Sequence, residues 1–268
     1  MRRLSVCALL SIVLLPLSVV AEERHFPLDA IESETLEAHG SPMLATGVEG
    51  QSIVFDGDTL LRVRDSEDLT HEESGFTFSA WVNPYQLHGQ QQMIASKNRY
   101  SLDEREWGLM LDKDNRFRLY VWQGKWVTIS APKAPQVGHW ALLSVVIRPD
   151  LAELRVDGKV VGEVALANPI PRTAAPLTLG GVDDNGHIWQ NFVGAIDDVR
   201  LWDEPLAASH LAELYSPIDQ THQIPKFTGF MNVEPDSSWE ERITEHAAQD
   251  RSVVAFDGQD PDKLACDT

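Results

Sequence analysis

The segment from 192 to 202, F-V-G-A-I-D-D-V-R-L-W, constrains the fold most, because it is apolar at nearly every second position. That spacing is typical of a β-strand. Alternation would place on one face Val193, Ala195, Val199 and Leu201, and on the other Phe192, Ile196 and Trp202. A strand that is apolar on both faces lies in the middle of a packed sheet. Asp197, which alternation puts beside Val199, must then be hydrogen-bonded, paired or bound to a cation.

The rest of the chain carries further signals for short strands joined by tight turns. Residues 76–82, F-T-F-S-A-W-V, alternate cleanly between two faces, and Asp-Gly pairs at 56–57 and 157–158 separate β-rich runs. The pattern gives about a dozen short strands at regular spacing. A short helix over 206–215 follows Pro205, a residue type preferred in the first helical turn. A Greek-key sandwich and a closed barrel both fit this pattern.

One motif narrows the choice of fold. Eight residues occupy the places of the pattern F-x-G-x-I-D-x-V-R-hydrophobic-aromatic and a following leucine, namely Phe192, Gly194, Ile196, Asp197, Val199, Arg200, Trp202 and Leu206. The pattern resembles the closing strand of the laminin-G-like and pentraxin-like jelly rolls, which have the concanavalin A-like lectin fold. The resemblance continues in F-D-G at 55–57, F-T-F-S-A-W-V at 76–82 and G-H-W at 138–140, and spans about residues 25–216. It implies an all-β fold, a two-sheet antiparallel jelly-roll sandwich with one short helix after the last strand.

The N-terminus predicts export. Residues 1–3 are Met-Arg-Arg, an apolar run follows over 4–20, and Glu22 comes after a small residue. The run is too short for a membrane span and is followed by acids, so we expect a secretory signal peptide over 1–21. The mature protein would be secreted, periplasmic or on the cell surface, with no membrane insertion after cleavage.

We expect the jelly-roll domain over 22–216. The prediction for 217–268 is a linker or tail, partly helical, or the start of a further domain. Cleavage would remove Cys7 and leave Cys266, which excludes an internal disulfide and a cysteine-rich metal site. The net charge of −19, from 41 acidic and 22 basic residues, argues against nucleic acid and anionic membranes as partners.

The loop before the closing strand is the first candidate metal site. Residues 180–194 read G-G-V-D-D-N-G-H-I-W-Q-N-F-V-G. They resemble the place where pentraxins bind calcium, and the resemblance assigns Asp183, Asp184 and Gln190 as ligands, with Asp103 from a neighbouring loop. Calcium takes about six to eight oxygens from several loops. The alternative is that Asp-Asp-Asn-Gly is only a polar hairpin turn.

A second candidate metal site joins acids that are distant in the sequence. The resemblance to laminin-G-like domains, in which an ion sits at the rim of the sandwich, assigns Asp56 or Asp58 together with Asp197 or Asp198. The alternatives are that Asp56 serves the tight turn and that Asp197 is hydrogen-bonded to the backbone or to Arg200.

Four aromatic residues on neighbouring predicted strands form a candidate sugar platform: Trp107, Tyr120, Trp122 and Trp126. Tyr120 and Trp122 are two residues apart in a strand and so share a face. Sugars stack their apolar C–H faces on exposed rings. The alternative is that the rings fill the core, which we predict for Trp107 and leave open for Trp122 and Trp126.

The sequence argues against catalysis. Glycosidases of the resembled fold carry their acids on one strand with the spacing Glu-x-Asp-x-x-Glu, and that spacing does not occur in the chain. Motifs for serine hydrolases, zinc proteases and phosphate-binding loops are also missing. A carboxylate pair assembled from separate strands, with Glu104, Glu106 and Asp112, is the remaining catalytic option.

We therefore predict a secreted, non-catalytic module that binds carbohydrate or an extracellular protein surface with the help of calcium. The alternative from another class is a glycoside hydrolase or polysaccharide lyase of the same fold, or the accessory module of such an enzyme. A third option is a structural adhesion module without sugar specificity. The ligand itself is not encoded in the fold, because one fold hosts many functions.

Overall fold

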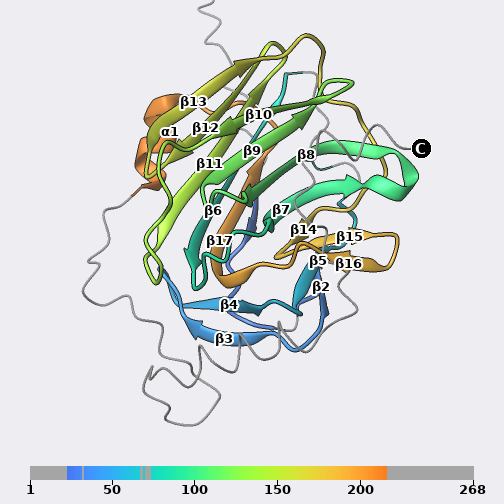
Figure 1. The fold of residues 1–268 in the computed structure, drawn as a ribbon. Helices are drawn as coiled ribbons and strands as arrows, with labels where there is room; N and C mark the ends of the chain where they lie inside the picture. Colours follow the sequence, from blue (N-terminus) through green and yellow to red (C-terminus); the bar gives the residue numbers. More distant parts are fainter. Residues whose placement is uncertain (1–22, 32, 67–68, 70–73, 216–268) are drawn as a thin grey trace, which may run out of the picture.

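The computed structural model describes residues 23–31, 33–66, 69 and 74–215, which form two antiparallel sheets packed face to face (Figure 1). The eight-stranded sheet has the order β13-β12-β11-β6-β17-β4-β3, with β1 also paired to β17. Its strands are β1 (Glu23–Phe26), β3 (Met43–Thr46), β4 (Gln51–Asp56), β6 (Phe76–Pro84), β11 (Ala141–Arg148), β12 (Leu151–Val156), β13 (Lys159–Ala165) and β17 (Val193–Trp202).

The seven-stranded sheet has the order β10-β9-β8-β7-β14-β5-β2. Its strands are β2 (Leu36–His39), β5 (Leu60–Val63), β7 (Gln92–Arg99), β8 (Glu104–Leu111), β9 (Phe117–Trp122), β10 (Trp126–Ser130) and β14 (Thr178–Leu179). A separate hairpin, β15 (Val182–Asp184) with β16 (His187–Trp189), lies beside β14 and β5 in Figure 1. The helices of the described residues are the 3-10 turn η1 (Tyr100–Leu102) and α1 (Ala208–Leu214). This architecture confirms the predicted two-sheet sandwich with one short α-helix.

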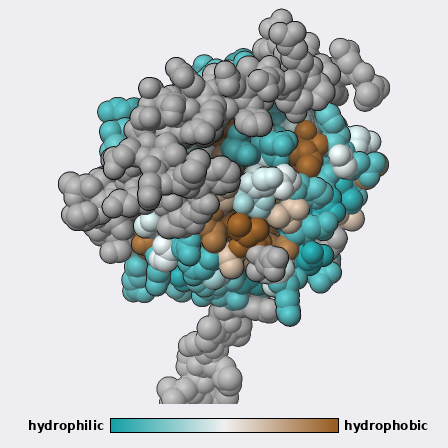
Figure 2. Space-filling model, turned by 90° about the horizontal axis from the view of Figure 1, so that it is seen from below, coloured by the Kyte–Doolittle hydropathy of each residue, from teal (hydrophilic) through white to brown (hydrophobic). Residues whose placement is uncertain are grey.

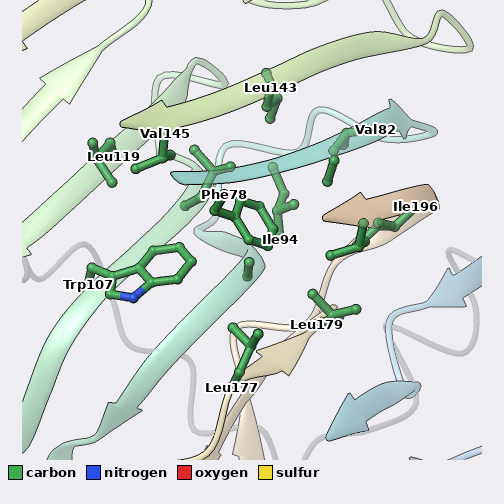
Figure 3. Close-up of a cluster of buried hydrophobic side chains, with 14 of the residues drawn as sticks. Phe78, Val82, Ile94, Trp107, Leu119, Leu143, Val145, Leu177, Leu179 and Ile196 are labelled. Atoms are coloured by element: carbon green, nitrogen blue, oxygen red, sulfur yellow. The ribbon is translucent and has the colours of Figure 1, made fainter. Parts of the chain in front are cut away.

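The core lies between the sheets and follows from strand alternation. In β6, Phe78 and Val82 point inward, and Leu143 and Val145 of β11 join them there (Figure 3). Trp107 of β8 is fully buried and packs 5.3 Å from Phe78, measured between ring centroids. The prediction that this tryptophan belongs to the core is confirmed. Burial of apolar area on both inner faces stabilises the sandwich, since each large side chain removed from water contributes about 1.5–3 kcal/mol.

The closing strand β17 lies between β6 and β4, as predicted, but its two faces differ from simple alternation. A bulge interrupts its register with β6 between Asp197 and Arg200, and Asp198 has a left-handed φ of 47°. The extra residue reverses the pleat. Phe192, Ile196, Val199 and Leu201 therefore all join the core, whereas Val193, Ala195 and Trp202 face outward. The prediction that Asp197 shares the face of Val199 is wrong, because this bulge separates them.

Helix α1 packs on part of the outer face of the eight-stranded sheet. Leu211 of the helix packs on Val146 and Trp202. Its backbone N–H donates to the carbonyl of Ala207 at 3.1 Å, which makes Ala207 the cap residue. The helix thus begins two residues later than the sequence predicts. No helix in the described part of the chain has the length and apolar character that crossing a membrane requires.

Apolar side chains on the surface are scattered. Among the described residues, the large hydrophobic side chains that are exposed are Leu102, Val137 and Val160, which come from three separate segments. The end of the sandwich seen in Figure 2 is mainly hydrophilic, with a small hydrophobic area near its centre. Single exposed apolar residues are normal on soluble proteins, so these three do not mark an interface.

Candidate functional site

An aromatic cluster lies on the outer face of the seven-stranded sheet. Alternation in β9 sends Leu119 and Val121 into the core, and so sends Tyr120 and Trp122 outward. Trp126 of β10 pairs with Trp122 across the two strands. The prediction that Tyr120 and Trp122 share a face is confirmed. We call these three rings, together with Tyr100 and Trp189, the aromatic cluster.

Gly108 leaves room for the innermost ring of the cluster, that of Tyr120. Tyr120 lies directly over Gly108 of β8, where a Cβ would stand 2.2 Å from the tyrosine hydroxyl. Trp126 meets Tyr120 edge-on, with centroids 4.7 Å apart and an interplanar angle of 83°. Trp122 meets Trp126 in the same way at 4.9 Å and 66°. The rings therefore interlock at steep angles instead of forming one flat platform.

Two segments from outside the sheet complete the cluster. Tyr100 of η1 stands edge-on to Trp126, with centroids 6.1 Å apart. It also stands edge-on to Trp189 of the hairpin, at 5.3 Å. Val182, the partner of Trp189 in the hairpin, is fully buried against the same rings. The hairpin and η1 thus cover the inner part of the cluster, whereas Trp122 at its outer end stays half-buried.

The tyrosine hydroxyls form a buried polar network under the rings. The hydroxyls of Tyr100 and Tyr120 lie 3.0 Å apart, and the amide of Asn98 donates to Tyr120 at 3.1 Å. The same amide donates to the carbonyl of Trp107 at 2.7 Å. Burial raises the pKa of both tyrosines, so their hydroxyls stay protonated and keep donating hydrogen bonds. This network fixes the rings in place.

The three ring residues predicted as ligand contacts differ in exposure. Tyr120 is 1% exposed and Trp126 is 7% exposed, so both support the surface from below. Trp122 is half-buried and is the most exposed of the three. The guanidinium of Arg105 lies 5.1 Å from its ring centroid, a distance at which a cation attracts an aromatic face. The outer surface of the site is therefore formed by Trp122 and Arg105.

Sequence reasoning missed Tyr100, Trp189 and Arg105. Tyr100 and Trp189 reach the cluster only because η1 and the hairpin fold back over the sheet, and nothing in their local sequence shows that. Arg105 lies two residues before the inward-facing Trp107, so simple alternation would place it on the inner face and gives no sign that it reaches Trp122.

The two hairpin acids of the first predicted metal site have different partners and do not converge on one point. Asp183 is 2% exposed, is paired with Arg62 through one oxygen, and accepts the Gly186 backbone N–H at 2.7 Å with the other. Asp184 accepts both the backbone N–H and the hydroxyl of Ser101, each at 2.8 Å. This contact joins the hairpin to η1, so the structure does bring the loops of Asp184 and Asp103 together.

The two other predicted ligands of that site point elsewhere. Asp103 is paired with Arg105 and is 87% exposed. Gln190 has a left-handed φ of 53°, and its amide nitrogen donates to the side chain of Gln91 at 2.6 Å. Its own amide oxygen is buried without a hydrogen-bond partner among the described residues. That oxygen is one that a cation could use.

The second predicted metal site is not assembled. Asp56 pairs in register with Val193, four residues before Asp197, which corresponds to about 13 Å along the strand. Asp56 instead accepts the backbone N–H of Asp58 at 3.0 Å, which is the turn role left open above. Asp197 accepts the backbone N–H of Val48 at 2.6 Å and that of Glu49 at 3.2 Å, whereas Asp198 pairs with Arg200.

The predicted ligands as placed here do not fit a calcium ion. Arg62 already supplies the positive charge beside Asp183, and N–H or O–H donors occupy oxygens that calcium would need. Over the described ranges, no three His, Cys, Asp or Glu side chains gather closely enough to hold a metal ion. Calcium stays a prediction, and no step of binding is assigned to it.

The acids considered for catalysis are held apart by structural contacts. Glu106 is buried beside Lys97, with the nitrogen and oxygen 3.4 Å apart, and Asp112 is buried 3.1 Å from Arg118. The two acids lie six residues apart on β8 and its extension, about 20 Å along the strand. Glycosidase carboxylates stand only about 5–9.5 Å apart. Glu104 is paired with Arg99. Each of the three acids is therefore engaged in an ion pair, and the distance excludes a glycosidase pair made of Glu106 and Asp112.

Comparison with known families decides the classification. A family model described as the concanavalin A-like lectin/glucanases superfamily matches residues 55–212, which is more than half of the chain. The chain belongs to this superfamily. The predicted resemblance to laminin-G-like and related jelly rolls is confirmed. No curated protein matches the chain in sequence.

Solved structures of the superfamily fold match the chain at low sequence identity. Domain 4 of AbnA, a GH43 extracellular arabinanase from Geobacillus stearothermophilus solved with arabinotriose, has a TM-score of 0.60 and 19% identity over 73% of this chain and 99% of that one. The binding domain of Paraclostridial Mosquitocidal Protein 1 has a TM-score of 0.54 and 16% identity, over 67% of this chain and 46% of that one. The botulinum neurotoxin serotype G binding domain has 0.53 and 11%, over 68% and 46%. The chain thus spans less than half of the two toxin domains. At these identities the likeness establishes the fold alone.

Proposed function

We propose that this protein is an exported, non-catalytic module that binds carbohydrate on the outer face of its seven-stranded sheet. The observation that carries the proposal is the half-buried ring of Trp122, held by Trp126 beneath it and flanked by Arg105. An aromatic ring fixed before binding loses little conformational entropy when a ligand stacks on it. The guanidinium beside it can donate hydrogen bonds to sugar hydroxyls.

Two further points support the proposal. The arabinanase domain of the same fold was solved with arabinotriose, so this architecture accommodates an oligosaccharide in at least one protein. The acids that a hydrolase would need are engaged in buried ion pairs, as described for Glu106 and Asp112. A protein surface is the rival ligand, and it would need a larger contact area than one ring and its neighbours provide.

Export is part of the proposal and rests on the sequence alone. The predicted signal peptide over 1–21 and the predicted tail over 217–268 lie outside the described residues. Detection of the mature chain outside the cytoplasm, starting at residue 22, tests this part.

Replacing Trp122 by Ala is expected to weaken binding of a neutral oligosaccharide at least about thirtyfold, the loss typical of an anchoring aromatic residue. Trp122→Phe keeps a smaller ring, so its affinity for the oligosaccharide should fall much less. The measurement is calorimetric titration with a panel of neutral oligosaccharides that includes arabinotriose. Val160→Ala, at an exposed site on β13 in the other sheet, is the matched control. Unchanged affinity in Trp122→Ala would show that this face is not the binding site.

A further inference from the structure

A second concave site lies on the same sheet, beyond the hairpin. It is a pocket of about 370 Å³, lined by Glu37, Arg62, Val63, Arg64, Asp65, Arg99 and Pro176. In β5, Leu61 and Val63 join the core, so Arg62 between them points outward. The hairpin β15–β16 touches both sites, since Asp183 pairs with Arg62 and Trp189 contacts Tyr100. We call this the arginine pocket.

Two of the three guanidinium groups are held in place by the protein itself. Arg62 is fixed by the buried carboxylate of Asp183. Arg99 is fixed by Glu104 and donates to the carbonyl of Ala174 at 2.6 Å. Each guanidinium carries five N–H donors, so one or two anchoring contacts leave others available. Groups ordered in advance give affinity at a smaller entropic cost.

The remaining donors in the pocket are incompletely satisfied. The Nε of Arg62 is buried and has no hydrogen-bond partner among the described residues. A buried N–H without an acceptor is destabilising, because it has lost its hydrogen bond to water. Arg64 lies 3.9 Å from Glu37, with both side chains substantially exposed, and such a pair contributes little. An acceptor entering the pocket would gain charge-assisted contacts from Arg64 and from the N–H groups of Arg62 and Arg99 that their anchoring contacts leave available.

The charge of the pocket differs from that of the whole protein. Three arginines and two acids line it, and the carboxylates of Asp183 and Glu104 are paired with two of these arginines, so its charges nearly cancel, whereas the chain as a whole carries 22 basic and 41 acidic residues. A planar carboxylate matches the fork of N–H groups on arginine. A densely charged polyanion would be repelled by the surrounding negative surface. The pocket therefore suits a ligand with a single acidic group on an otherwise neutral body. Its volume lies near the lower end of ligand pockets, about 300–1,000 Å³, which suits one sugar ring.

We propose that the arginine pocket binds the carboxylate of a uronic acid residue, through Arg62, Arg64 and Arg99. This inference rests on the proposed carbohydrate-binding function and names the class of sugar, a mainly neutral glycan that carries isolated uronic acids. The aromatic cluster would hold a neutral part of the same glycan.

The test is a titration of the full-length protein with D-glucuronate, with D-glucose as its neutral counterpart, observed by NMR at the arginine Nε–H signals. Glucuronate should shift the signals of Arg62, Arg64 and Arg99, and glucose should not. Arg64→Gln should weaken glucuronate binding about tenfold, the effect of one charge-assisted contact. Arg62→Lys keeps the positive charge beside Asp183 but loses the paired N–H groups of the guanidinium, so it should also weaken glucuronate binding. Arg24→Gln removes the same charge from an exposed position on β1 and should change nothing.

Three outcomes would overturn the proposal: no shift of these signals with glucuronate, equal affinity in Arg64→Gln and wild type, or equal binding of acetate, which would make the pocket a general anion site. If galactose 6-sulfate bound more tightly than glucuronate, the pocket would recognise a sulfate ester and the proposal of a carboxylate would be wrong. If neutral oligosaccharides still bind through Trp122, only the arginine pocket is refuted. Arginine shifts without any Trp122-dependent binding would refute the proposed function instead.

Discussion

Replacing Lys97 by Met is expected to destabilise the protein by about 3–5 kcal/mol, because it leaves a buried carboxylate without its cation. Lys97 and Glu106 are both fully buried, and the lysine also donates to the carbonyls of Ser66 at 3.2 Å and Ala175 at 2.9 Å. Glu106 accepts the backbone N–H and the hydroxyl of Thr173, at 2.9 and 2.7 Å. The pair thus joins β7 and β8 to two loops. Urea unfolding of the variant measures the loss.

The matched double variant separates the ion pair from simple packing. Lys97→Met combined with Glu106→Gln removes both charges and keeps an acceptor for Thr173, so it should recover a large part of the lost stability. Lys125→Met, at an exposed position in the turn between β9 and β10, should change stability by no more than about 0.5 kcal/mol. A loss below about 1 kcal/mol for Lys97→Met would contradict the account.

Replacing Asp197 by Asn is expected to stabilise the protein at pH 8 by an amount on the order of 4 kcal/mol, and to leave stability at pH 4 nearly unchanged. The carboxyl group is fully buried, and burial raises its pKa from 3.8 to about 7. One oxygen holds the backbone N–H groups of Val48 and Glu49, and a Cβ on the adjoining Gly47 would lie 2.4 Å from it. The other oxygen has no hydrogen-bond partner among the described residues.

The sign follows from proton linkage at this group. Its folded pKa of about 7 lies above its ordinary value of 3.8, so the folded state binds the proton more tightly than the unfolded state does. The contribution to stability is therefore fully present below about pH 4 and is lost progressively as the pH rises to about 7. Asparagine keeps an oxygen for Val48 and Glu49 and does not ionise, so the variant avoids this loss.

The measurement is urea unfolding of wild type and Asp197→Asn at pH 4, 6 and 8, in the presence of a chelator. Asp150→Asn, at an exposed carboxylate, is the matched control for the substitution itself. The same series in calcium tests the predicted metal. A cation at Asp197 would hold the carboxylate ionised and make Asp197→Asn destabilising at pH 8. In chelator, the free energy of unfolding of the variant should exceed that of wild type by an amount that grows with pH. If this difference does not grow, the raised pKa of the buried Asp197 carboxyl is contradicted.

Strand alternation predicted the strands and their faces, and the resemblance to a known family selected the two-sheet sandwich. The two faces of β6, the shared face of Tyr120 and Trp122, and the place of β17 inside its sheet all follow from local pattern. The faces of β17 beyond Ile196 did not, because the bulge depends on a left-handed Asp198. Aspartate adopts that conformation only occasionally, so the sequence gives no sign of it.

The candidate site was only partly predictable for a different reason. The sequence places Tyr120 and Trp122 on one face, but it cannot show which rings are covered, since the cover comes from η1 and the hairpin. The acids of the hairpin illustrate this point. Asp183 and Asp184 were interpreted through a calcium-binding family, yet their contacts are Arg62 and Ser101, which lie far away in the sequence. Ionic contacts of this kind are set by tertiary structure.

The most direct test of the proposed site uses the eight tryptophans of the chain as separate probes. Their indole N–H signals are followed by NMR during titration with the neutral oligosaccharide that binds best in the panel. We expect chemical-shift changes at the indole N–H signals of Trp122 and Trp189, and none at that of the core residue Trp107. Shifts confined to Trp81 and Trp140, on the outer face of the other sheet, or no shift with any oligosaccharide, would contradict it.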